Sequence, residues 1–333
     1  MRRHQHSSVV IGGQGGVRRR AEGLRFLGTE GRGAIAEAGE KERQPGSHSG
    51  ERYADRSGRG RLAIMAVLRV NGTEIYFEVH GEATKPAAIV MGGWGSFAHG
   101  AISGVPRAVR DRCQVLVWDY PGIGESDLDR AHQPSMRRYG AIAAALCDHL
   151  GWSSVHLIGI VGMGACVAQE IAINRPDLAR SLFMTGCWAR PDARLTDVLN
   201  LFRDVHRSLG FDAMQMMAAS LSFDPVFYDA NRSRLLGAKG AWGELRGRLE
   251  AHERLVQACL DHDATGRLHR IACPTHLVHA GADCITPPAC TLALEDGIAG
   301  ATGELWPELP HAIAGRETKL RFDEIIGQFL DIH

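Results

Sequence analysis

The chain has 333 residues, of which 44% are hydrophobic and 23% are charged, a composition that suits a globular protein with a substantial core. Its 38 basic and 38 acidic residues cancel, so no excess of positive charge predicts binding to nucleic acid. The sequence contains no run of 18 apolar residues, so we expect no transmembrane helix and no membrane partner.

Residues 1–64 differ in composition from the rest of the chain. They hold 13 basic against 7 acidic residues, 13 of the 40 glycines and two aromatic residues. Such a segment buries too little apolar surface to offset the entropy of ordering, so we expect a disordered, basic Gly/Arg-rich leader. Its arginine runs are not followed by the apolar stretch of a secretory signal. We interpret Met65 as the start of the translated protein and the leader as an over-extended reading frame.

The eight cysteines are scattered along the chain without a Cys-x-x-Cys pair. This spacing argues against a structural zinc site and against a disulfide framework. We therefore expect reduced thiols and a cytoplasmic protein.

Two β-rich runs, 67–70 and 73–79, are joined by Asn71 and Gly72. Because both turn positions of a tight hairpin need positive φ, the Asn-Gly pair predicts an antiparallel hairpin. Apolar runs alternating with helical stretches follow. The expected strands are 87–91, 114–118, 155–160, 181–184 and 275–280, and the expected helices lie near 135–150, 163–175, 287–296 and 317–330. This alternation predicts an α/β fold, a mostly parallel sheet with helices on both faces, and catalytic groups at the carboxyl ends of the strands.

Residues 188–262 break the alternation with amphipathic helical sequence, which predicts a helical cap insertion. Flexible thioethers and aromatic rings suit apolar ligands, so Trp188, Met216 and Phe227 are candidates for a substrate pocket. Packing of the cap onto the sheet would explain such residues equally well. Further candidates of the same kind are Met214, Met217, Phe223 and Trp242. The expected division is a leader at 1–64, a first core part at 65–187, the cap at 188–262 and a second core part at 263–333.

Four motifs occur in a fixed order along the chain. They are IVMGGWG at 89–95, WDYPGIGESD at 118–127, CPT at 273–275 leading to Asp283, and LPH at 309–311. Together they resemble the α/β-hydrolase family over roughly residues 66–333. The segments CWARPD at 187–192 and HDATGRL at 262–268 resemble the branch that contains enol-lactonases, aminoacrylate-type hydrolases and cofactor-free bromoperoxidase-like proteins. The resemblance implies a small carbonyl-containing substrate and neither a cofactor nor a metal.

Members of this family attack with the serine of a Gly-x-Ser-x-Gly turn between a strand and a helix. The matching stretch here is LIGIVGMGACVAQE at 157–170, which contains no serine. Aligned from the strand side, Val161 stands at the nucleophile position. Aligned from the helix side, Gly162 stands there, which implies one inserted residue. Neither side chain can attack a carbonyl group.

The resemblance assigns His311 as a catalytic base and Asp283 as the carboxylate that orients it. It also assigns an oxyanion hole to the backbone N–H of Trp94 and of the residue after the turn, Gly162 or Met163. An Asp–His dyad without a nucleophile can still remove a proton from water or from carbon, an effect worth about 10²–10⁴-fold in rate. This predicts general-base hydrolysis or lyase chemistry on a small ester-like substrate.

Other reactive side chains are interpreted as structural. Cys166 lies about one helical turn beyond the expected turn, and Ser96 and Ser126 stand in turn-like sequence. His276 and His279 have the spacing of metal ligands, but residues three apart on a strand point to opposite faces. We therefore expect no metal.

Two alternatives remain open. A non-catalytic protein of the same fold would bind a ligand or a partner in its pocket, and a homodimer is compatible with either function. In the lesser alternative, a dinucleotide-binding oxidoreductase, Gly162 and Gly164 would open a pyrophosphate-binding helix. Against it, Val167 occupies the third glycine position of that fingerprint, and the strand-like run that ends at Met184 is not followed by the acidic residue expected to hold a ribose.

Overall fold

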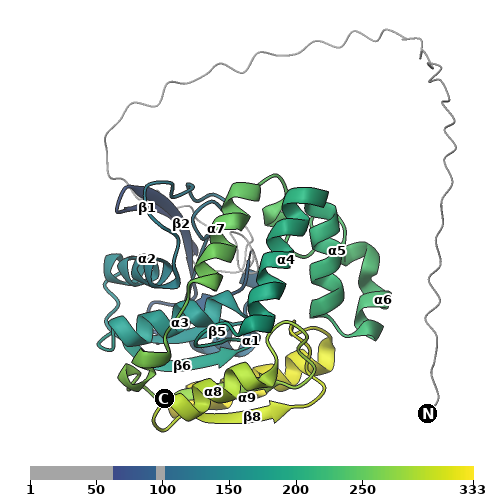
Figure 1. The fold of residues 1–333 in the computed structure, drawn as a ribbon. Coiled ribbons are helices and arrows are strands. Elements are labelled where there is room, and N and C mark those ends of the chain that lie inside the picture. The colour runs from purple at the N-terminus through teal and green to yellow at the C-terminus, as the bar shows by residue number, and fades with distance from the viewer. Residues whose placement is uncertain (1–62, 95–101) are drawn as a thin grey trace, which may run out of the picture. The chain divides into compact units, whose positions relative to one another are not determined.

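The computed structural model describes residues 63–94 and 102–333 (Figure 1). The expected leader at 1–64 therefore lies, apart from its last two residues, outside the described part of the chain. The described residues form an α/β structure built around one sheet of eight strands.

The sheet has the strand order β1-β2-β4-β3-β5-β6-β7-β8. Its strands are β1 (Ala63–Val70), β2 (Thr73–His80), β3 (Ala87–Met91), β4 (Gln114–Trp118), β5 (Val155–Ile160), β6 (Ala179–Thr185), β7 (Thr275–Ala280) and β8 (Thr302–Trp306). The β1–β2 and β2–β4 pairs are antiparallel, and all the others are parallel. The expected α/β fold with a mostly parallel sheet is confirmed.

The first two strands form the expected hairpin. Asn71 and Gly72 take φ values of 48° and 89° at the turn, which is why this dipeptide suits the position. The first strand begins two residues before Met65, because Ala63 pairs with His80 and Ile64 with Val79. The expected core boundary at residue 65 therefore falls inside β1.

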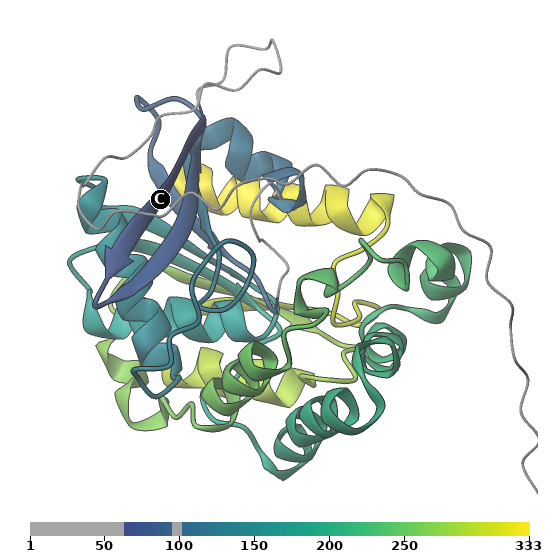
Figure 2. The ribbon, with the colours of Figure 1, turned by 90° about the horizontal axis from the view of Figure 1, so that it is seen from above.

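Helices cover both faces of the sheet. They are α1 (Arg107–Arg112), α2 (Met136–His149), α3 (Met163–Asn174), α4 (Ala193–Leu209), α5 (Phe211–Ser222), α6 (Pro225–Leu235), α7 (Leu249–Leu260), α8 (Pro288–Gly297) and α9 (Arg316–Ile332). Alternate residues of β3 enter two separate cores: Ile89 joins the core that includes α2 and α3, whereas Val90 joins the one that includes α1 and α9. Figure 2 shows α1 and α9 side by side on their own face.

The segment between β6 and β7 contains helices α4 to α7 and, in this fully described stretch, no strand. Asp192 caps α4 by accepting the Leu195 N–H at 2.7 Å. The apolar stripe of Leu195, Leu199 and Phe202 on α4 is buried, as its helical spacing requires. These helices, green in Figures 1 and 2, gather beyond one end of the sheet.

Two elements, α1 and β8, were not expected from the sequence. The first is six residues long, too short to show a helical period. The second lies at the edge of the sheet, and only Trp306 of its five residues is buried, so it lacks the apolar run of an internal strand. Both elements depend on tertiary contacts for their stability.

Within the described ranges, no helix is long and apolar enough to cross a membrane. All eight cysteines lie in these ranges and are unpaired.

Helix α3 lies so close to the sheet that glycine is required at its second residue. A Cβ at Gly164 would stand 2.2 Å from the Met91 carbonyl oxygen, a backbone atom that cannot turn aside. We expect Gly164→Ala to lower the free energy of unfolding by about 3 kcal/mol, the upper end of the usual cost of overpacking. Urea unfolding measures this change. Gly266→Ala is the control, because a Cβ there meets nothing within 4 Å; equal stability of the two variants would contradict the packing argument.

Buried histidines should make the fold sensitive to acid. Burial, with a contribution from His206, lowers the pKa of His252 to about 3, and burial lowers that of His262 to about 4. Below about pH 6.5 the unfolded chain binds protons at these positions while the native state does not. Each residue therefore removes about 1.4 kcal/mol of stability per pH unit as the pH falls from about 6 to about 4.

Unfolding by urea at several pH values tests this expectation. His252→Gln should flatten the slope of stability against pH by about one proton. His269→Gln should leave the slope unchanged, because His269 is exposed. An unaltered slope in His252→Gln would refute the assignment.

Candidate active site

A strained turn connects β5 to α3. The strand ends at Ile160, Val161 and Gly162 both have φ of 61°, and α3 begins at Met163. Positive φ is rare for a β-branched residue and costs of order 1–3 kcal/mol. Strain of this kind concentrates at functional sites, where the surrounding structure maintains it.

Gly162 stands at the tip of this turn. With φ 61° and ψ −118°, it directly precedes the first residue of α3. A Cβ built on it would lie 3.9 Å from Cε1 of His311 and 3.8 Å from the Trp188 ring. This geometry favours the alignment made from the helix side. Val161, which stands at the nucleophile position in the alignment made from the strand side, directly precedes Gly162 in the turn.

Two loops from the carboxyl ends of β7 and β8 bring Asp283 and His311 together. Asp283 Oδ2 lies 2.8 Å from His311 Nδ1. The carboxylate is completely buried, while 11% of the His311 side chain is exposed. The other carboxylate oxygen, Oδ1, accepts the backbone N–H groups of Ile285 at 2.7 Å and Thr286 at 2.8 Å. The pair predicted from the sequence is therefore in hydrogen-bond contact and faces Gly162.

The imidazole is held by one of its two nitrogens. Besides Asp283, the Thr286 hydroxyl lies 3.2 Å from Nδ1, a contact that the sequence did not predict. Among the described residues, Nε2 has no hydrogen-bond partner. With the Nδ1 proton donated to the carboxylate, Nε2 is the unprotonated nitrogen and can accept a proton.

The expected oxyanion hole needs one correction. The Gly162 N–H donates to the Gly186 carbonyl oxygen at 2.7 Å, so it does not serve a substrate oxygen. Met163 opens α3, and amides of a first helical turn have no acceptor within their own helix. Met163 and Trp94 both line the cavity described next, which keeps their backbone amides as the candidate donors.

A cavity of about 500 Å³ lies in front of the turn. Its floor contains Val161, Gly162 and His311, and its walls come largely from the helices between β6 and β7. The apolar side chains that line the cavity include Trp94, Trp188, Leu195, Leu199, Phe202, Phe223, Trp242 and Ile285. A volume and lining of this kind suit a small ligand that is mostly apolar.

The three residues predicted for the substrate pocket have different positions. Trp188 lines the cavity. Met216 does not line it, because 46% of its surface is exposed on the outer side of α5. Phe227 does not line it either; its ring stacks on Phe223 at a centroid distance of 5.4 Å, and Phe223 contacts the cavity instead. Helical periodicity identifies an apolar stripe but not which neighbour it packs against.

Cys259, Cys166 and Ser126 do not replace a nucleophile. Cys259 lines the cavity, but burial raises the pKa of its thiol to about 12, so it stays protonated. Burial also raises the pKa of Cys166, whose Sγ contacts the Trp188 carbonyl oxygen at 3.5 Å. Ser126 Oγ donates to the Asp119 carbonyl oxygen at 2.8 Å, a turn contact. Ser96 lies outside the described residues.

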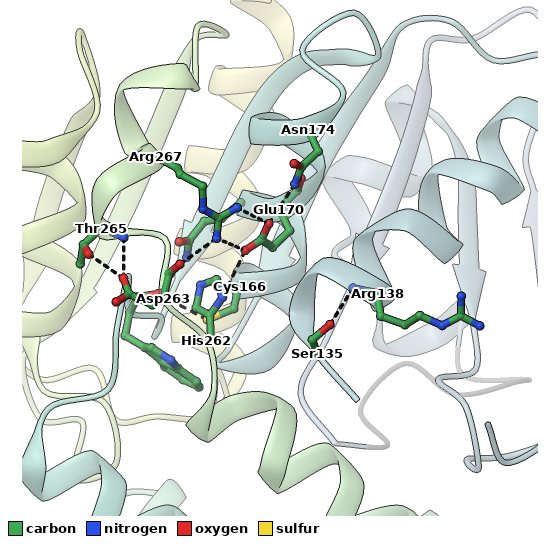
Figure 3. A network of polar contacts seen from close by, with 11 residues as sticks. Ser135, Arg138, Cys166, Glu170, Asn174, His262, Asp263, Thr265 and Arg267 are labelled. Atoms are coloured by element: carbon green, nitrogen blue, oxygen red, sulfur yellow. Dashed lines mark hydrogen bonds and ion pairs between the residues drawn. The ribbon is translucent and has the colours of Figure 1, made fainter. Parts of the chain in front are cut away.

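An ion pair joins the buried Glu170 on α3 to the partly exposed Arg267 (Figure 3). The Glu170 carboxylate accepts two hydrogen bonds from Arg267, at 2.7 and 2.6 Å, and one from Asn174 at 2.9 Å. Burial alone would raise the pKa of Glu170, but Arg267 and the nearby His262 leave it lowered. This pair ties α3 to the segment at 262–268, which explains the His and Arg of that motif.

The two histidines with metal-like spacing have separate partners. His276 Nδ1 contacts Thr302 at 2.9 Å, whereas His279 contacts Thr291 at 2.8 Å and Glu295 at 2.6 Å. Across residues 63–94 and 102–333, no group of three His, Cys, Asp or Glu side chains has an arrangement that could hold a metal ion.

The sheet order, the strained turn after β5 and the loops after β7 and β8 define an α/β hydrolase. A family model described as "Serine aminopeptidase, S33" matches residues 105–318, and the chain belongs to this family. The turn between β5 and α3 in this chain, Val161 and Gly162, contains no serine.

The relatives and solved structures that resemble the chain have low sequence identity to it over the aligned residues. The "Putative carbamate hydrolase RutD" of Pseudomonas savastanoi pv. phaseolicola is 26% identical over 216 residues, which cover 64% of this chain and 82% of the relative. A crystal structure of a hydrolase from Pseudomonas aeruginosa superposes with a TM-score of 0.70 at 20% identity, covering 83% of this chain and 99% of that one. The enol-lactonase from Burkholderia xenovorans gives a TM-score of 0.68 at 19% identity, covering 80% and 99%.

The position of the turn tip can be tested by restoring a nucleophile. We expect Gly162→Ser to create hydrolysis of p-nitrophenyl acetate with a burst of p-nitrophenol. A Cβ at this position would stand 3.9 Å from Cε1 of His311, so the hydroxyl attached to it could reach the imidazole. Val161→Ser is the matched control and should give no burst. A burst in Val161→Ser alone would show that the strand-side alignment is correct after all.

Proposed function

We propose that the protein hydrolyses a small ester, lactone or carbamate by general-base activation of water. The observation that carries this proposal is the bonded Asp283–His311 pair facing a turn tip, Gly162, that has no side chain. The relatives named as a carbamate hydrolase and an enol-lactonase support the substrate class, since both act on a carbonyl group bonded to a heteroatom.

In the proposed reaction, a water molecule occupies the space next to Gly162 that a serine hydroxyl would otherwise fill. His311 Nε2 removes a proton from this water while the oxygen forms a bond to the substrate carbonyl carbon. Asp283 stabilises the imidazolium that results and remains ionised. The water thus takes the part of the missing nucleophile, and no covalent acyl-enzyme forms.

The tetrahedral intermediate carries its negative charge on the former carbonyl oxygen. The backbone N–H groups of Met163 and Trp94 stabilise that charge. Collapse of the intermediate breaks the bond to the leaving oxygen or nitrogen, which takes the proton from His311 Nε2. The products are an acid and an alcohol, enol or amine, and the dyad returns to its starting state.

The same base could remove a proton from carbon, which would make the protein a lyase. Hydrolysis is favoured because Gly162 leaves room for a water molecule beside the imidazole. The dinucleotide alternative loses its main support, because Gly164 is explained by its contact with Met91 and not by the approach of a pyrophosphate.

Removal of the base is the direct test. We expect His311→Ala to lower kcat/KM by about 10²–10⁴-fold on whichever member of a panel of activated esters, enol-lactones, carbamates and β-acyloxy carbonyl compounds the wild type turns over. Asp283→Asn should cause a similar loss, because an amide stabilises the wrong imidazole tautomer.

His269→Ala, a change at an exposed histidine, controls for general effects and should retain full activity. Turnover that survives unchanged in His311→Ala would refute the assignment of His311 as the base. No turnover of any compound by the wild type would favour a non-catalytic binding protein instead.

A further inference from the structure

The cavity has a charged side that hydrolysis itself does not require. Besides the dyad and the apolar walls, it is lined by Arg107 and Arg110 on α1 and by Lys319 and Asp323 on α9. These two helices lie next to each other on one face of the sheet (Figure 2). The cavity therefore extends from the turn tip to the α1–α9 side of the molecule.

Two of the three cations at this side form no ion pair with any residue that the structure describes. Arg107 pairs with Asp111 at 3.0 Å on the outer surface. Arg110 is half-buried, and its one hydrogen bond among the described residues goes from Nε to the Val105 carbonyl oxygen at 3.1 Å. Lys319 is exposed and makes no ion pair with any described residue.

The single carboxylate in this part of the lining, Asp323, makes a backbone contact instead of a direct ion pair. Asp323 Oδ1 accepts the backbone N–H of Ala108 at 3.1 Å and forms no ion pair with Arg110 or Lys319. An unpaired guanidinium that is partly removed from water favours an anion, and arginine matches the planar geometry of a carboxylate.

We propose that Arg110 and Lys319 bind a carboxylate on the substrate. The substrate class is then an amphiphile with an apolar body against the aromatic walls, a hydrolysable carbonyl group near His311, and a free carboxylate at the α1–α9 side. The position of the hydrolysable group in this substrate rests on the proposed function, whereas the carboxylate site does not. Binding and hydrolysis can therefore be tested separately.

Tryptophan fluorescence measures binding without turnover, because Trp94, Trp188 and Trp242 line the cavity. The probes are 4-phenylbutyrate and its neutral amide, 4-phenylbutyramide, which differ in charge but not in shape. The full-length wild-type protein should bind the carboxylate at least tenfold more tightly than the amide. Raising the NaCl concentration roughly tenfold, from about 50 to about 500 mM, should reduce this preference because salt screens the attraction between charges.

Charge-removing variants locate the preference. Arg110→Gln and Lys319→Gln should each weaken carboxylate binding several-fold and leave amide binding unchanged, and the double variant should bind both probes equally. Arg316→Gln is the matched control, since it removes an exposed cation from the same helix, α9, outside the cavity lining. It should retain the full preference.

The outcomes separate this inference from the proposed function. A carboxylate preference that persists in a protein with no hydrolytic activity would support the anion site and contradict only the hydrolysis. Equal affinity for the two probes, binding of neither probe, or a preference that survives in the double variant would overturn the anion site, even if neutral esters are hydrolysed.

Discussion

The hydrogen bond between Asp283 and His311 is the interaction on which the site depends. A buried carboxylate is costly unless its oxygens are satisfied, and here two backbone amides and the imidazole satisfy them. Because Nδ1 is engaged, Nε2 remains the free base on the side of the ring that faces the cavity. The bond requires the loops after β7 and β8 to leave the sheet at the same end, and the parallel pairing of these strands places both of their carboxyl ends there.

The turn after β5 keeps its strained backbone although its tip lacks a nucleophile. Val161 retains a positive φ that a β-branched residue adopts only at a cost, and the turn still places α3 directly behind the base. Gly159 and Gly164 lie so close to neighbouring backbone that a Cβ at either position would clash, and these close approaches allow α3 to pack on the sheet. The turn therefore preserves the amide of Met163 and the space beside the imidazole, which are the two features that water-mediated chemistry needs.

The segment between β6 and β7 forms part of the cavity wall. The buried stripe of α4 and the rings of Trp188 and Trp242 close an apolar cavity over the dyad. Two contacts couple these helices to the catalytic loops: Arg194 donates to the Cys284 carbonyl oxygen at 2.5 Å, and the Ala312 N–H donates to the Ser222 carbonyl oxygen at 2.8 Å. Packing of this insertion and the position of the dyad are thus not independent.

The sequence by itself determined the alternation of strands and helices and the hairpin at Asn71 and Gly72, because periodicity and turn chemistry are local properties of the chain. The Asp283–His311 pair followed from the resemblance of its motifs to the α/β-hydrolase family. Only the tertiary structure bears on which residue tops the turn, since an insertion can be absorbed on either side and it is Gly162 whose built Cβ lies beside His311. It also decided that Met216 faces outward and that Arg110 and Lys319, more than 200 residues apart in the chain, line one cavity. The sequence shows that a side chain is apolar or charged. Which residues surround that side chain is set by how elements distant in the chain pack together.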